Sequence, residues 1–202
     1  MKIVEGGKGI RSFIAILLPE NIKLNLDELS QKLKNNLDST STKISWIRSE
    51  SIHLTLKFLG TIDPAQVKPI LQKLNDIACT TQPFSITMEG LGVFPNFSHP
   101  RVLWVGIKEG AKEICHLQRR VEEKMKEVGF TIEKKEFNAH CTLGRIKSIQ
   151  SRGVIARAFH AIENQKIGVM EVNKINLMKS TLLASGAVYE QLGSAHFDKT
   201  KT

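Results

Sequence analysis

Two segments of the chain each place a histidine two positions before a threonine. His53 and Thr55 lie in SIHLTLKFLG, and His140 and Thr142 lie in AHCTLGRIK. An imidazole with an ordinary pKa near 6.5 can donate or accept a proton close to neutral pH. A threonine hydroxyl can donate a hydrogen bond to a negatively charged oxygen. Two such pairs would supply an acid, a base and stabilising donors for a reaction at one centre.

Both segments alternate like β-strands, so each histidine should share a face with its threonine. The apolar residues between them point to the other face: Ile52, Leu54, Leu56 and Phe58 in the first segment, and Ala139, Cys141 and Leu143 in the second. A single His-x-Thr in a strand is usually structural, but two copies, each followed by a cation, favour a function. The histidines are 140 − 53 = 87 positions apart. We therefore expect the fold to bring both strands to one cleft.

The elements that would position these strands form a mixed α+β pattern with two similar halves. The chain has 202 residues and 41% apolar residues, enough for one domain with a substantial core. Helices are predicted near 22–37, from 63 onward, at 111–128 and, more weakly, over 148–162. Further strands are predicted at 11–18, 43–48, 84–88, 101–107, 168–172, 175–183 and 186–192, with a turn-rich loop at 90–100. Residues 1–202 are expected to form one domain of two pseudo-symmetric lobes.

Composition narrows the cellular setting and the partners. No apolar run approaches eighteen residues, and the run FIAILLP is too short for a signal peptide, so we expect no membrane association. The three cysteines are odd in number and widely spaced, which argues against a disulfide framework or a zinc site and favours the cytoplasm. The net charge of +9 and the pI of about 9.5 predict attraction to polyanions. We expect a monomer.

The paired motifs HLTL and HCTL resemble those of the 2H phosphoesterase superfamily. Within it, the chain is similar to the RNA 2′,3′-cyclic phosphodiesterases, also called 2′–5′ RNA ligases, of bacteria and archaea. The resemblance extends to RSFIAILLP, HLTLKFLG, RVLWVGI, HCTLGR and the pattern from Ser180 to Tyr189, so it covers nearly the whole chain. It implies two antiparallel-sheet lobes flanked by helices, with the active site in the groove between them.

The resemblance implies hydrolysis of RNA 2′,3′-cyclic phosphate ends to 2′-phosphomonoesters, and ATP-independent joining of RNA ends through a 2′–5′ bond. It assigns His53 as the proton donor to the leaving 3′ oxygen and His140 as the base. The chemistry also suits the residues themselves, because in-line attack by water needs one base and one acid. Thr55 and Thr142 would donate to the non-bridging oxygens, and Arg145 could clamp them. No metal or other cofactor is expected.

Several residues are open to two interpretations. Lys57 shares the predicted face of His53 and is a candidate either for phosphate contact or for a solvated side chain. Arg145 is an odd number of positions from His140, so it reaches the cleft only if the strand turns at Gly144. Trp46, Phe94 and Phe97 could stack on a nucleobase, with a core position favoured for the first two.

Other functions remain compatible with the sequence. One is a phosphodiesterase for small cyclic nucleotides, which would bind mononucleotides as well as RNA ends. Another is a non-catalytic RNA-binding module, whose function would survive loss of His53 and His140. A metal enzyme is a third class, which sensitivity to a chelator would reveal.

Overall fold

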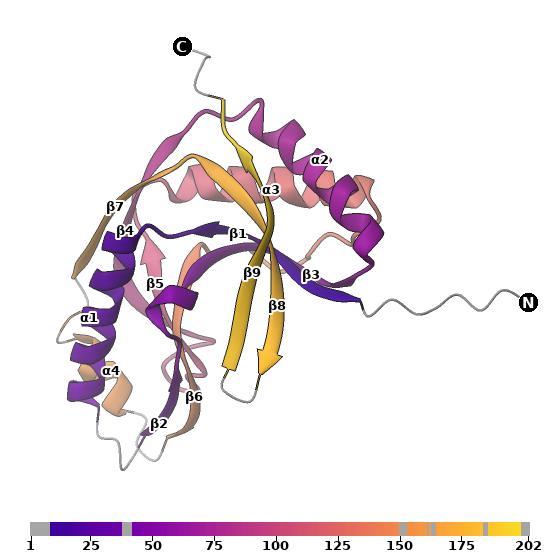
Figure 1. Ribbon diagram of the computed structural model, residues 1–202. Coiled ribbons are helices and arrows are strands. Elements are labelled where there is room, and N and C mark those ends of the chain that lie inside the picture. Colours follow the sequence, from indigo (N-terminus) through magenta and orange to yellow (C-terminus); the bar gives the residue numbers. More distant parts are fainter. Residues whose placement is uncertain are drawn as a thin grey trace, which may run out of the picture.

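The computed structural model describes residues 9–37, 42–149, 153–160, 162, 165–183 and 186–198. In these residues four α-helices pack on a nine-stranded sheet (Figure 1). The helices are α1 (Glu20–Asn36), α2 (Val67–Ala78), α3 (Ala111–Glu127) and α4 (Gly153–His160). The strands are β1 (Ile10–Leu17), β2 (Thr42–Trp46), β3 (His53–Ile62), β4 (Phe84–Phe94), β5 (Val102–Ile107), β6 (His140–Ile149), β7 (Lys166–Val172), β8 (Lys174–Leu183) and β9 (Gly186–His196).

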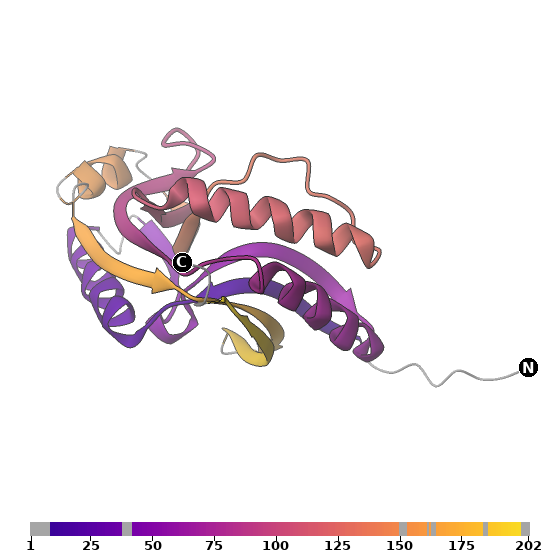
Figure 2. The same ribbon diagram turned by 90° about the horizontal axis from the view of Figure 1, so that it is seen from above.

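The strands follow the order β7-β4-β5-β6-β3-β1-β8-β9, with β2 beside β6, and neighbouring strands pair antiparallel. Helices α2 and α3 lie at one end of the molecule and α1 and α4 at the other (Figures 1 and 2). The predicted α+β fold with two lobes is thus confirmed. The two motif strands lie in one continuous sheet, because β3 pairs directly with β6.

Helical periodicity explains why the long helices pack where they do. In α1 the residues at helical spacing are fully buried, namely Ile22, Leu26, Leu29 and Leu33. In α3 the same holds for Ile114, Leu117, Val121 and Met125. These stripes join the buried faces of both lobes in a single hydrophobic core. The opposite face of the sheet carries a much smaller cluster around Phe13, Ala15 and Met178.

The helix start predicted at Asp63-Pro64 is confirmed. The Asp63 side chain accepts a hydrogen bond from the Ala65 backbone N–H, and the Gln66 side chain accepts one from the Asp63 backbone N–H. This capping box opens a 3-10 turn, Pro64–Gln66, that leads into α2. Pro69 lies in the first turn of α2, where its missing N–H costs no hydrogen bond within that helix.

Two predicted boundaries are wrong. The loop predicted over 90–100 is confined to 95–100, because β4 continues to Phe94 through an irregularity at Gly90, whose φ is +85°. Gly92 is required inside that strand, since a Cβ there would lie 2.1 Å from the indole of Trp104. Of the weak helix predicted over 148–162, residues 148 and 149 belong to β6 and Gly153–His160 form α4, while 150–152 and 161 lie outside the described residues.

In the described part of the chain, none of the helices is both long enough and apolar enough to cross a bilayer.

Candidate active site

The two His-x-Thr segments are neighbours in the sheet. Strands β3 and β6 pair antiparallel with Leu54 opposite Cys141. One step further along this register, His53 lies opposite Thr142 and Thr55 lies opposite His140. The four residues are therefore arranged about a local two-fold axis that passes between Leu54 and Cys141. The structure brings together two histidines that are 87 positions apart in the sequence.

All four side chains lie on the face of the sheet opposite the main core. Leu54 and Cys141 are both 0% exposed and belong to that core, so their strand neighbours point the other way. The two histidines occupy diagonal positions across the strand pair. In antiparallel sheets such diagonal neighbours lie about 7–8 Å apart, and their Cβ atoms are somewhat closer. The two imidazoles therefore project from neighbouring positions on one face of the sheet.

A bulge in β6 puts Arg145 on the same face. Against β5, Thr142 pairs with Trp104 but Gly144 pairs with Leu103, so Leu143 is an extra residue. A bulge of this kind shifts the alternation by one residue. Arg145 therefore shares a face with Thr142 although their spacing is odd. The positive charge of Arg145 lowers the pKa of His140. Within the described residues no carboxylate forms an ion pair with Arg145.

A matching bulge in β3 removes Lys57 from this face. Against β1, Thr55 pairs with Ala15 but Lys57 pairs with Ile14, so Leu56 is the extra residue. Lys57 consequently turns into the protein and is only 7% exposed. Both sequence interpretations of Lys57, phosphate contact and solvated side chain, are wrong.

Lys57 instead forms a buried ion pair with helix α3. Its Nζ donates to Glu122 Oε2 at 2.5 Å and to the Thr131 backbone oxygen at 2.8 Å. Glu122 is 6% exposed and also accepts from the Glu133 backbone N–H at 3.2 Å. The pair thus ties β3 to α3 and to the segment that leads from α3 toward His140.

The same bulge brings Phe58 to the active-site face, which the sequence pattern did not predict. Phe58 is 70% exposed, and its ring centroid lies 6.2 Å from that of Phe13. It occupies the position in its motif that Arg145 occupies in the other, five residues after the histidine. The exposure of a large aromatic ring beside a polar site is typical of a surface that binds a flat ligand.

Each imidazole is held by a backbone carbonyl two residues before it, just ahead of its strand. His53 Nδ1 lies 2.9 Å from the Ser51 carbonyl oxygen, and His140 Nδ1 lies 2.6 Å from the Asn138 carbonyl oxygen. A carbonyl oxygen can only accept, so Nδ1 carries the proton in both rings. Nε2 is then the atom that gains or loses a proton, as a general acid or base requires.

Aromatic rings surround both histidines. His53 stacks on Phe13 with centroids 4.7 Å apart and meets the edge of Tyr189 at 5.0 Å. His140 meets Phe94 edge-on at 4.9 Å and lies 6.2 Å from Trp104. These contacts hold each ring in place and exclude water from one side of it.

Burial lowers the pKa of both histidines. For His53 the cause is desolvation, partly offset by the hydrogen bond to Ser51. For His140 desolvation is again the main cause, the hydrogen bond to Asn138 opposes it, and the charge of Arg145 lowers the pKa further. Of the two, His140 therefore has an additional reason to stay neutral, which suits a base.

The aromatic residues proposed to stack on a base have different surroundings. Trp46 packs against the core with Lys34 Nζ 5.5 Å from the centroid of its ring. Phe97 is 44% exposed and meets Phe159 edge-on at 5.9 Å. Phe94 alone of the three contacts a predicted catalytic histidine, His140.

Comparison with known proteins points to one family. The LigT-like phosphoesterase model matches residues 16–104 and again 105–189, and each segment contains one His-x-Thr motif. The RNA 2′,3′-cyclic phosphodiesterase of Aquifex aeolicus is 34% identical over 187 residues, covering 90% of this chain and 94% of the relative. The protein of the same name from Archaeoglobus fulgidus is 33% identical over 183 residues, covering 91% and 98%.

Solved structures agree in fold. TT0787 of Thermus thermophilus superposes with a TM-score of 0.77 at 25% identity, covering 93% of this chain and 98% of that one. LigT of E. coli in its apo form has a TM-score of 0.73 at 18% identity, covering 95% and 99%.

Proposed function

Because this chain belongs to the LigT-like phosphoesterase family, we propose that it hydrolyses RNA 2′,3′-cyclic phosphate ends to 2′-phosphomonoesters. The observation that supports the proposal is the pairing of Leu54 with Cys141, which puts two imidazoles, each held by a backbone carbonyl, at neighbouring positions on one face of the sheet. Curated relatives named RNA 2′,3′-cyclic phosphodiesterase support the substrate class.

The reaction proceeds by in-line displacement at phosphorus. His140 Nε2 accepts the proton of the attacking water, and His53 Nε2 donates a proton to the 3′ oxygen as the bond from phosphorus to that oxygen breaks. The phosphate stays on the 2′ oxygen. The charge of Arg145, which lowers the pKa of His140 and has no counterpart at His53, supports the assignment of His140 as the base.

Negative charge builds on the non-bridging oxygens during this step. Thr55 and Thr142 face the phosphate from opposite strands and donate hydrogen bonds to those oxygens. Arg145 adds a guanidinium that can bind two oxygens at once. Two imidazoles and these donors supply the acid, the base and the charge stabilisation, so the proposed mechanism requires no metal ion.

RNA is preferred to small cyclic nucleotides on two grounds. The net charge of +9 attracts a polyanion, and Phe58 offers an exposed ring on the active-site face for a nucleobase. A 5′-hydroxyl of a second RNA could replace water as the nucleophile and form a 2′–5′ bond without ATP. Hydrolysis is the main activity because water is always present at the site.

The test is incubation of the protein with an RNA oligonucleotide ending in a 2′,3′-cyclic phosphate, in excess chelator. We expect a 2′-phosphate product, and a lower KM than for a 2′,3′-cyclic mononucleotide. A 3′-phosphate product, loss of turnover in chelator, or no turnover would each reject the proposal.

A further inference from the structure

Six exposed cations gather at one end of the molecule, in segments whose sequences contain no carboxylate. The segments are 42–48, 95–102 and 140–160, which hold β2, the start of β5, β6 and α4 (Figure 1). None of the three contains Asp or Glu. Among the described residues, the exposed cations of these segments, which we call the cationic end, are Lys43, Arg48, Arg101, Arg145, Lys147 and Arg157.

Strand pairing and one ring contact bring the three segments together. Arg145 of β6 lies opposite Ser45 of β2 on one side and opposite Val102 of β5 on the other. Phe97, in the second segment, meets Phe159 of α4 edge-on at 5.9 Å. The six cations therefore belong to one contiguous region, although they are spread over 157 − 43 = 114 positions of the sequence.

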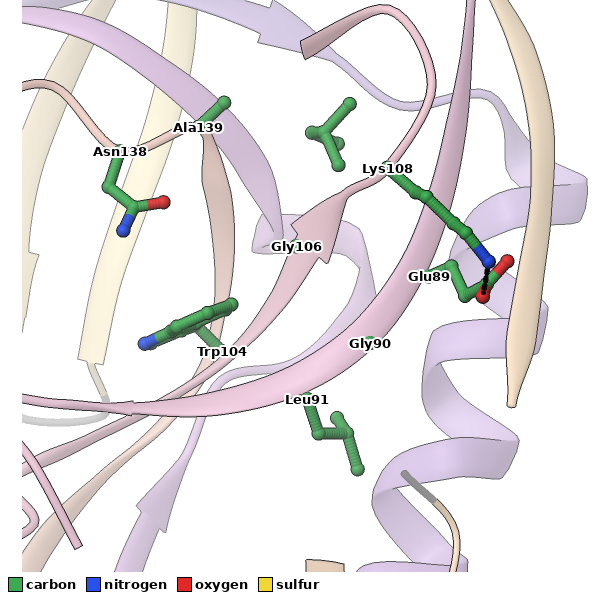
Figure 3. Close-up of a pocket in the computed structure, with 9 residues that line it drawn as sticks. Glu89, Gly90, Leu91, Trp104, Gly106, Lys108, Asn138 and Ala139 are labelled. Carbon is green, nitrogen blue, oxygen red and sulfur yellow. Dashed lines mark hydrogen bonds and ion pairs between the residues drawn. The ribbon is translucent and has the colours of Figure 1, made fainter. Parts of the chain in front are cut away.

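Ion pairing distinguishes the cationic end from the other flanks of the molecule. None of its six side chains forms an ion pair with a carboxylate in the part of the chain that the structure describes. Elsewhere exposed cations are paired: Lys108 with Glu89 beside the recess over β4 and β5 (Figure 3), Lys73 of α2 with Glu127 of α3, and Lys179 of β8 with Glu190 of β9. The net charge of +9 is therefore distributed unevenly, and the cationic end carries unbalanced positive charge.

The cationic end begins on the catalytic face of the sheet. Strand β6 pairs with β3 at Cys141 and with β2 from Gly144 onward, so β2 takes the place of β3 along β6. Ser45 lies opposite Arg145 and shares its face, and Lys43, two residues along β2, faces the same way. At about 3.3 Å per residue, Lys43 is about 7 Å beyond Ser45, a distance that one nucleotide can span. A chain that leaves the histidines along β6 therefore meets Arg145 first and Lys43 next.

The chemistry of these groups suits a phosphodiester chain. Guanidinium and ammonium groups bind phosphate oxygens, and the exposed hydroxyls of Ser45 and Ser148 add uncharged donors on the same pair of strands. An RNA that ends in a cyclic phosphate has all its other nucleotides on the 5′ side, so their phosphates must leave the site along one surface. The cationic end is a surface of matching charge that is continuous with the site.

We propose that the cationic end binds the backbone phosphates of single-stranded RNA on the 5′ side of the cyclic phosphate; this inference rests on the proposed function. Arg145 serves the reacting phosphate. Lys43 and Lys147 bind phosphates upstream of it, and the remaining cations extend the same surface. These contacts are equally strong before and during the displacement at phosphorus, so they lower KM for longer RNA and leave kcat unchanged.

The experiment compares substrates with and without an upstream chain. Turnover is measured on uridine 2′,3′-cyclic phosphate and on an oligouridine of about eight nucleotides with the same end. In Lys43→Ala/Lys147→Ala, KM for the oligonucleotide should rise at least about fivefold, with kcat changed less than about twofold. Both constants for the mononucleotide should stay unchanged. The slope of log KM for the oligonucleotide against log salt should fall by about 1.4, because each lost phosphate contact removes about 0.7.

Two control variants separate local contact from general charge. Lys43→Arg/Lys147→Arg keeps both charges and should keep KM for the oligonucleotide and its salt slope. Lys112→Ala/Lys126→Ala removes the same amount of charge from exposed positions on α3, which lies at the other end of the molecule. This variant should leave both quantities close to those of the wild type.

The outcomes distinguish this inference from the proposed function. An unchanged KM for the oligonucleotide in the alanine variant of the cationic end would overturn the inference and leave an acidic protein as the partner that these charges fit. An equal loss on the mononucleotide, or an equal effect of the α3 variant, would also overturn it. Absence of hydrolysis in the wild type would reject the proposed function. Fluorescence anisotropy of a labelled oligouridine with a 3′-hydroxyl end would then test the cationic end by itself, and equal affinities of the wild type and the alanine variant would overturn the inference.

Discussion

Leu54 and Cys141 lie opposite one another where strand β3 pairs with strand β6. Both side chains are fully buried, so the residues on either side of each must face outward together. This one register position explains why His53, Thr55, His140 and Thr142 share a site. The surroundings of the two histidines differ, because Arg145 acts on His140 and not on His53, and this difference predicts distinct roles for them.

The roles of acid and base can be separated by changing the leaving atom. His53→Ala and His140→Ala should each lower kcat on the natural cyclic phosphate by about 10²–10⁴-fold. When sulfur replaces the 3′ oxygen, the leaving thiolate needs little protonation. We expect the defect of His53→Ala to shrink by at least about tenfold and that of His140→Ala to persist, because only the acid becomes dispensable. Rescue of His140→Ala instead would reverse the assignment.

Arg145 should lower the pKa of His140 further than burial alone does, and should leave that of His53 unchanged. Its charge disfavours protonation of His140, so Arg145→Met should raise that pKa. The base must be neutral, and the acid limb of the pH profile of kcat/KM should therefore move to higher pH. Imidazole resonances followed by NMR across pH measure both histidines at once. Arg119→Met, on the exposed face of α3, is the control; an equal shift of both histidines would contradict the assignment.

The buried ion pair of Lys57 and Glu122 should contribute strongly to stability. Lys57→Met leaves a carboxylate buried without its partner, at a cost of about 3–5 kcal/mol in the free energy of unfolding. Lys57→Met/Glu122→Leu removes both charges and should regain most of that loss. Urea denaturation followed by circular dichroism measures the series. A single variant as stable as the wild type would show that Lys57 is not paired in solution.

Phe58 should contribute to substrate binding and not to folding. Its ring is 70% exposed, so Phe58→Ala should leave the unfolding midpoint unchanged. Loss of one stacked base costs about 1–3 kcal/mol, so KM for the RNA substrate should rise by about 5- to 150-fold. Phe97→Ala, also exposed but packed on Phe159, is the control and should leave KM unchanged. Equal effects of the two variants would exclude a specific role for Phe58.

The sequence predicted the fold class and the meeting of the two motif strands because period-two alternation and the duplicated motif are strong local signals. It could not predict on which face of the sheet the side chains of Lys57, Phe58 and Arg145 lie. Each follows a bulge created by one extra residue, Leu56 or Leu143, and a bulge depends on how the neighbouring strand pairs.

The continuation of β4 to Phe94 was missed for a related reason. Gly90 and Gly92 are typical of a loop, yet Gly92 is there because the indole of Trp104, from the neighbouring strand, occupies the space of its side chain. Such a requirement arises only after the strands have paired. Local periodicity therefore identified the motif strands, and tertiary pairing decided which of their residues enter the site.

The most direct measurement compares turnover of an RNA 2′,3′-cyclic phosphate by the wild type, His53→Ala, His140→Ala and the double variant, all in chelator and all shown to be folded. If both imidazoles act on one phosphorus, each single variant should lose orders of magnitude in kcat, and the double variant should be scarcely slower than the worse single variant. A single variant that retains turnover close to the wild type would contradict the two-histidine mechanism.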